Sequence, residues 1–119
     1  MLMKNARGNW LEVKDMDTVR LIERIREVPE AYLGVGDSIF LDFVNFCVGY
    51  DLCQNLHGKF ESKDLLYPGE INQFVAKEIN IDCGTPCAVT MITQNTKSSE
   101  EAFNLYCDLR VKFQVELLK

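Results

Sequence analysis

The feature that most constrains the fold is a long segment, Ile39 to Leu56, whose apolar residues lie around most of a helix circumference. Such a helix belongs in the middle of a domain, because no side of it suits water. Gly49 lies inside this segment and costs about 0.5–1 kcal/mol relative to alanine. We therefore expect a neighbouring helix, or the turn around Gly34, to approach it closely. We predict that Ile39–Leu56 is the central and most buried helix.

Capping residues, prolines and glycines set the limits of the neighbouring elements. Asp17 or Thr18 can cap the first turn of an amphipathic helix, and Pro29 ends that helix by restricting the residue before it. A turn with two glycines at residues 31–38 then leads into the central helix. Gly58 is suited to terminate the central helix.

Two further helices follow, together with one ambiguous segment. Pro68 suits the first turn of a helix, where its missing N–H group has no partner to lose. Residues 86–95 contain β-branched residues typical of a strand, but begin with a proline typical of a helix start. We favour a helix there because no partner strand is evident, and the alternative stays open. Ser98, three residues before Glu101, predicts the capping box of the last helix.

Length and composition fit one domain. The chain has 119 residues, of which 47% are hydrophobic and 26% charged. We predict an all-α fold: a compact bundle of four or five helices around one central buried helix, spanning residues 1–119, with residues 1–14 as an N-terminal arm.

No apolar stretch approaches the ~20 residues that cross a bilayer, and the N-terminus lacks an apolar block of signal-peptide length. We expect a cytoplasmic protein with no membrane partner.

The net charge of −5 comes from the middle of the chain. Residues 37–82 hold eight acidic side chains against three lysines, whereas both flanks are neutral. An acidic surface disfavours direct binding of nucleic acid and favours a basic protein partner, although acidity also simply promotes solubility. The candidate partner-binding residues are Asp37, Asp42, Asp51, Glu61, Asp64 and Glu70.

Few residues have the spacing of a chemical site. Cys53 and His57 lie four residues apart, so a helix places them on one face as a candidate thiol–imidazole pair. No orienting acid or oxyanion-hole signature accompanies them. Cys47, Cys53 and His57 form a candidate zinc set, with Cys83 and Cys87 as a further pair, but neither spacing matches a closed zinc site. We expect no catalytic residue, no metal and no cofactor.

The segment 28–34 is the part of the chain closest to a signature. It is Val-Pro-Glu-Ala-Tyr-Leu-Gly, and Gly49-Tyr50 follows within the central helix. We interpret this motif as structural rather than ligand-binding, because it contains no nucleophile, acid–base pair or phosphate-binding loop. Its residues are Pro29, Tyr32, Leu33, Gly34, Gly49 and Tyr50.

The order of these elements resembles a group of small bacterial proteins. That group has an arginine-proline-x-methionine-tyrosine-leucine-glycine motif and a later glycine-tyrosine pair, and some members resemble immunity proteins of polymorphic toxin systems, including contact-dependent growth inhibition. Val28 and Ala31 stand where the group has arginine and methionine. Phe74-Val75-Ala76 and Glu100-Glu101-Ala102-Phe103 extend the resemblance over about residues 17–116.

The resemblance implies a non-catalytic protein that neutralises a cognate toxin by occluding a functional surface. Many such toxins are nucleases and therefore basic, which would suit the acidic middle of this chain. Two alternatives remain: a helical adaptor or regulator that binds a non-toxin protein, and a small thiol enzyme that uses Cys53 and His57. A toxin gene directly upstream would favour the first hypothesis, and loss of function on Cys53→Ser would favour the enzyme.

Overall fold

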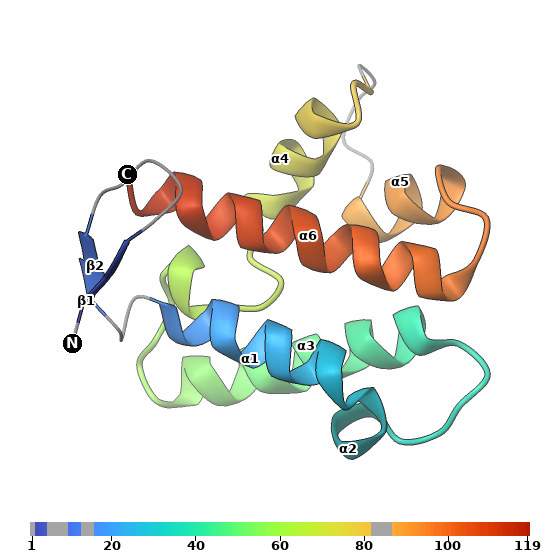
Figure 1. The fold of residues 1–119 in the computed structure, drawn as a ribbon, viewed down its shortest axis with the longest axis horizontal. Coiled ribbons are helices and arrows are strands. Elements are labelled where there is room, and N and C mark those ends of the chain that lie inside the picture. The colour runs from blue at the N-terminus through green and yellow to red at the C-terminus, as the bar shows by residue number, and fades with distance from the viewer. Residues whose placement is uncertain (1, 5–9, 13–15, 82–86) are drawn as a thin grey trace.

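The computed structural model describes residues 2–4, 10–12, 16–81 and 87–119. Helices account for nearly all of the regular structure, so the predicted all-α class is confirmed (Figure 1). Two three-residue strands pair in antiparallel fashion within the N-terminal arm, where no strand was predicted. The described elements are β1 (Leu2–Lys4), β2 (Trp10–Glu12), α1 (Asp17–Glu27), α2 (Pro29–Leu33), α3 (Ile39–Leu56), the 3-10 helix η2 (Ser62–Asp64), α4 (Ile71–Glu78), α5 (Ala88–Gln94) and α6 (Ser99–Leu117).

The predicted limits of the long helices agree with the structure. Ser38 Oγ accepts a hydrogen bond from Leu41 N at 3.4 Å, and Ser98 Oγ accepts one from Glu101 N at 3.1 Å. Gly58 follows α3 with a φ of 77°, the left-handed conformation that glycine adopts easily. The predicted start of α1 is wrong in its mechanism: residue 16 is its N-cap, and no side chain caps it. Thr18 instead donates a hydrogen bond to the carbonyl oxygen of Lys63.

The beginning of a segment predicted as a turn, and most of the segment left open between helix and strand, are helical. Pro29 ends α1, as predicted, but also starts the short helix α2 inside the expected turn, since a proline fits the first turn of a helix. Residues 88–94 form α5, which settles the choice between helix and strand there. Gly34 ends α2 with a φ of 71°, a conformation that a side chain would strain.

The central helix of the domain is α6. It packs against α1 and α3 on one side and against α4 and α5 on the other (Figure 1). Eight of its side chains are buried, including Phe103, Tyr106 and Phe113. The prediction that α3 is the most buried helix is therefore wrong, because α3 buries only Phe40, Phe43 and Cys47.

Helix α3 has one apolar face in the core and one apolar face in solvent. Phe43 packs edge-on against Phe103 with 5.1 Å between ring centroids. On the opposite face, Val48 and Leu52 are 62% and 59% exposed. Among the described residues, no atom beyond the neighbouring residues and the backbone of α3 lies within 4 Å of a β-carbon placed at Gly49, so none of them makes the close approach expected there.

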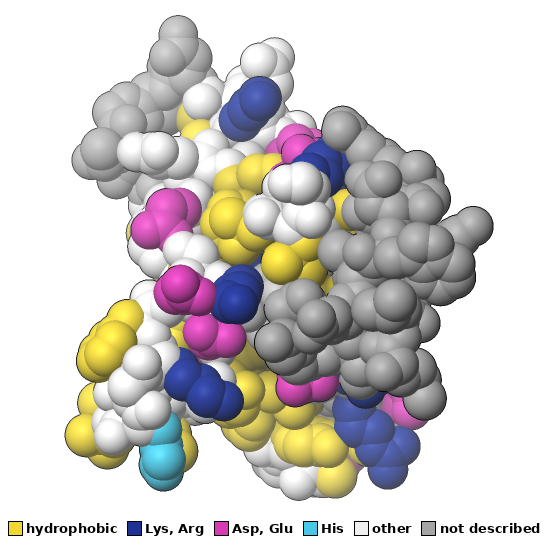
Figure 2. All heavy atoms as spheres, turned by 90° about the vertical axis from the view of Figure 1, so that its left-hand side faces the viewer, with side chains coloured by type: hydrophobic (Ala, Val, Ile, Leu, Met, Phe, Trp, Pro, Cys, Tyr) yellow, Lys and Arg dark blue, Asp and Glu magenta, His cyan; other side chains and the backbone are white. Residues whose placement is uncertain are grey.

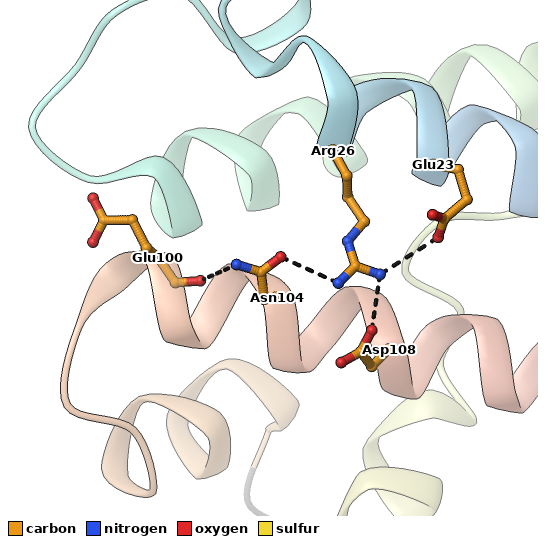
Figure 3. Close-up of polar contacts among 5 residues, drawn as sticks. All are labelled: Glu23, Arg26, Glu100, Asn104 and Asp108. Carbon is orange, nitrogen blue, oxygen red and sulfur yellow. Dashed lines mark hydrogen bonds and ion pairs between the residues drawn. The ribbon is translucent and has the colours of Figure 1, made fainter.

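Charged side chains join α1 to the central helix at the surface. Arg26 of α1 forms an ion pair with Asp108 of α6 at 2.8 Å and donates a hydrogen bond to Asn104 at 3.1 Å (Figure 3). Glu23, one turn earlier on α1, lies 3.4 Å from the same guanidinium group. Partial burial lowers the pKa of Arg26, but the hydrogen bond and charge of Asp108, with the charge of Glu23, outweigh this effect, so the pKa is raised. Arg26 thus holds the exposed edge of the α1–α6 contact.

Candidate protein-binding site

The candidate thiol–imidazole pair is not arranged for nucleophilic catalysis. Cys53 Sγ and His57 Nδ1 are 4.0 Å apart, whereas His57 Nδ1 lies 2.9 Å from the carbonyl oxygen of Cys53. A carbonyl can only accept, so Nδ1 must carry the proton and donate it to the backbone. That nitrogen therefore cannot remove the thiol proton in this arrangement. Both side chains are exposed at the end of α3.

The candidate zinc ligands lie on different sides of α3. Cys47 is buried in the core and Cys53 is exposed, so the two thiols do not converge with His57 on one ion. Cys83 lies outside the described residues. Among the residues that the structure describes, no group of three or more histidine, cysteine or acidic side chains could hold a metal ion.

The described thiols fall into two pairs with different surroundings. Burial raises the pKa of Cys107 to about 12 and raises that of Cys47 further. Cys87, exposed at the start of α5, lies 3.0 Å from Thr90 Oγ1. This hydrogen bond is the main cause of a lowered pKa at Cys87, because it stabilises the thiolate.

Asp51 holds the backbone of the 59–68 loop and is not a free surface acid. Its two carboxylate oxygens accept hydrogen bonds from Leu66 N at 2.7 Å and Tyr67 N at 2.9 Å. Burial raises the pKa of Asp51, while these two bonds and the positive charge of Arg110 act in the opposite direction. Asp51 is therefore removed from the set of candidate partner-binding residues.

Arg110 of α6 completes the attachment of the same loop. Its side chain is fully buried, and it donates to the carbonyl oxygens of Ser62 at 3.0 Å and Leu65 at 2.6 Å. Tyr106 donates to the carbonyl of Leu66 at 2.7 Å, and Gln54 to that of Asp64 at 3.0 Å. The irregular 59–68 loop thus obtains its hydrogen bonds from side chains of the helices around it.

Glu61 and Asp64 lie among lysines. Glu61 is 3.5 Å from Lys63 Nζ. Asp64 lines a pocket of about 280 Å³ that also contains Asp17, Lys59 and Lys63. Figure 2 shows acidic and basic side chains interleaved across this face of the molecule. These acids therefore do not form a surface of one sign. Glu70 is exposed at the start of α4.

In a second hollow, the charged residues among the described lining are all acidic. It lies beside the turn between α2 and α3, has a volume of about 190 Å³, and is lined by Glu30, Asp42 and Glu100. No lysine or arginine is among the described residues that line it. A β-carbon at Gly36 would overlap the Asp42 carboxylate, so this glycine makes room for the acid. We call this site the acidic hollow; its remaining wall is formed by Pro29, Leu33, Gly34, Val35 and Ile39.

The acidic hollow contains one predicted partner-binding residue and two that the sequence did not indicate. Asp42 lines it, and Asp37 is exposed in the adjoining turn. Glu30 and Glu100 are seventy positions apart and lie in the two flanks of the chain that have no net charge. The distribution of charge along the sequence therefore gave no reason to select them. Three residues of the motif interpreted as structural, Pro29, Leu33 and Gly34, form part of the wall of the acidic hollow. Tyr32 of the same motif does not line the hollow and packs edge-on against Phe46.

Comparison of the chain with protein-family models, with curated proteins and with solved structures finds no match. None of the described helices combines the length and the apolar composition that a membrane span requires.

Proposed function

We propose that this chain is an immunity protein that binds a basic toxin domain and occludes one of its functional surfaces. The acidic hollow is the observation that carries the proposal. Three acidic residues line it, one each from α2, α3 and α6, beside an apolar wall that includes Leu33 and Ile39. A lysine or arginine from a partner could place its charged group among the carboxylates and its aliphatic stem on that wall.

The rest of the molecule is consistent with a binding role. A binding protein needs a rigid frame more than a reactive group, and the hollow is built on two long helices and a turn fixed by Gly34. The carboxylates would also attract a basic partner before contact and so speed its association. The resemblance to toxin-system immunity proteins supplies the class of partner.

The test uses the purified product of the gene directly upstream as the probe. We expect it to bind the chain and to associate more slowly as salt rises, because ions screen the attraction over about 10 Å at 0.1 M ionic strength. A triple variant, Glu30→Gln with Asp42→Asn and Glu100→Gln, should slow association at low salt. It should also weaken the protection of cells that express the toxin.

The control removes the same charge elsewhere. Glu61→Gln with Glu70→Gln and Glu116→Gln changes three acids that lie outside the hollow. We expect this control to keep nearly the wild-type association rate once both variants melt at the same temperature. An equal effect of the two triple variants would contradict the role of the hollow. A lack of binding to the neighbouring gene product would remove the immunity assignment itself.

A further inference from the structure

The outer face of α3 carries an apolar strip that no part of the described chain covers. Its apolar members are Leu41, Val48, Leu52 and Leu56, which are 54%, 62%, 59% and 78% exposed. At 100° per residue, all of them lie within about 50° of one line along the helix. Asn45 and Gly49 complete this line and are exposed. We call these six residues the α3 strip; hydrophobic side chains also reach the surface near the end of α3, beside the single histidine (Figure 2).

The strip contains no charged residue. A basic partner would find no opposite charge on it, so the strip does not suit the partner proposed for the acidic hollow. Two copies of this chain, each with a net charge of −5, would repel one another through their acidic surfaces. That repulsion is weakest where the surfaces that meet are neutral and apolar. The strip is therefore a surface that a second copy can occupy, whereas a basic partner gains no charge interaction on it.

The spacing of the strip is symmetric about its own midpoint, between Val48 and Gly49. When two α3 helices cross in antiparallel orientation at this point, Leu41 faces Leu56 of the other copy and Asn45 faces Leu52. Val48 then faces Gly49, where the missing side chain leaves open space. Each contact occurs twice, as a two-fold interface requires. A parallel pair would place Val48 against Val48 and leave the two glycines facing each other across a gap.

We propose that the chain forms a two-fold homodimer in which the α3 strips pack antiparallel and cross at Gly49. The dimer explains a glycine in the middle of a long helix, because a helix can approach closely only where a side chain is absent. One helix face is smaller than the ~800 Å² per partner of a standard interface. The dimer should therefore dissociate on dilution, within about 1 µM to 1 mM.

The first test changes the crossing point. Sedimentation of the chain alone should show a monomer–dimer equilibrium, and Gly49→Gln should weaken the dimer at least about tenfold. This variant should remain folded, because an added β-carbon at Gly49 meets no described atom within 4 Å beyond the neighbouring residues and the backbone of its own helix. Gly69→Gln is the matched control, since Gly69 is likewise open and lies outside the strip. Equal dissociation of both variants would overturn the crossing at Gly49.

The second test reads the orientation. Leu52→Glu should abolish the dimer, and the addition of Asn45→Lys in the same chain should restore it, because position 45 faces position 52 of the other copy. The two positions are seven residues apart, so they do not pair within one helix. No restoration would overturn the antiparallel arrangement. A different outcome would assign the strip to the toxin instead. In that case the chain stays monomeric at all concentrations, and the Leu52→Glu variant no longer binds the product of the upstream gene.

Discussion

At the scale of single residues, the fold depends on charged groups that bind the backbone. Asp51 accepts from two N–H groups, and Arg110 donates to two carbonyl groups, of the 59–68 loop. A loop whose regular structure is limited to the short 3-10 helix η2 leaves buried backbone groups without partners of its own, so side chains must bind them. This explains why an arginine is fully buried on the central helix. It also explains why an acid counted as part of the surface charge is unavailable to a partner.

We expect Arg110→Met to lower the free energy of unfolding by about 3–5 kcal/mol. The buried carbonyl groups of the loop would lose their hydrogen-bond donor, and the Asp51 carboxylate would lose a nearby positive charge. Lys112→Met on the same helix is the control. Lys112 pairs with Glu78 at the surface, where such a pair contributes at most about 1 kcal/mol. Denaturant titration of both variants measures the difference. Equal losses would show that Arg110 does not support the loop.

The cysteines provide a prediction that depends on pH. The raised pKa values of Cys47 and Cys107 keep these buried thiols protonated, so they should resist alkylation in the native protein. Cys87 should react readily, and its rate should reach half of its maximum at a lower pH than in a Thr90→Val variant. The variant loses the hydrogen bond that stabilises the thiolate. Peptide mass mapping over a pH series measures each site, and an unchanged Cys87 profile in the variant would contradict this cause.

At the scale of elements, α3 shows why apolar composition is an incomplete guide to burial. Its residues are apolar on two opposite faces, and the sequence cannot tell a helix enclosed by neighbours from one that leaves a face open. The core face carries Phe43 and Cys47, and the other face carries the α3 strip. The central helix α6 is amphipathic by pattern, yet neighbours on both sides enclose it, and its buried polar residues Arg110 and Gln114 bind the loop.

The two faces of α3 should respond differently to the same change. We expect Phe43→Ala to cost about 3–5 kcal/mol, because it removes a ring packed on Phe103 and Tyr106. Leu52→Ala should cost less than about 0.5 kcal/mol at a protein concentration low enough for the monomer, since its side chain is exposed. Denaturant titration compares them. A loss below 1 kcal/mol for Phe43→Ala would show that the core is misplaced.

At the scale of the whole molecule, charge is arranged by the fold rather than by sequence position. Of the acids in residues 37–82, Asp51 attaches a loop, Glu61 and Asp64 lie near lysines, and Asp42 lines the acidic hollow. The hollow takes two of its three carboxylates from outside that segment. Charge-dependent binding should therefore follow the three residues of the hollow, and not the net charge of the middle segment.

We expect the protein to keep its fold without a metal ion. Dialysis against a strong chelator should leave the melting temperature unchanged, because the candidate ligands Cys47 and Cys53 point to different sides of α3. Untreated protein is the control, measured in the same buffer. Stoichiometric zinc in the purified protein, with a lower melting temperature after dialysis, would contradict this expectation.

The sequence by itself determined the class of the fold and most helix limits. Ser38, Gly58 and Ser98 act on backbone groups a few residues away, and such local interactions can be recognised in a linear chain. The start of α1 was predicted in the right place but for the wrong reason: Thr18 does not cap α1, because it bonds to the carbonyl of Lys63 in another part of the fold. The two strands of the N-terminal arm are too short for a sequence pattern to reveal.

Only the tertiary structure decided which helix is central and which residues form a site. Burial depends on the neighbours that surround a helix, and these come from segments far apart in the chain. The acidic hollow joins Glu30, Asp42 and Glu100 from three helices, and the α3 strip is defined by the absence of a neighbour. The physical reason is the same in both cases. Periodicity and capping describe one element, whereas a binding surface is a property of how several elements pack.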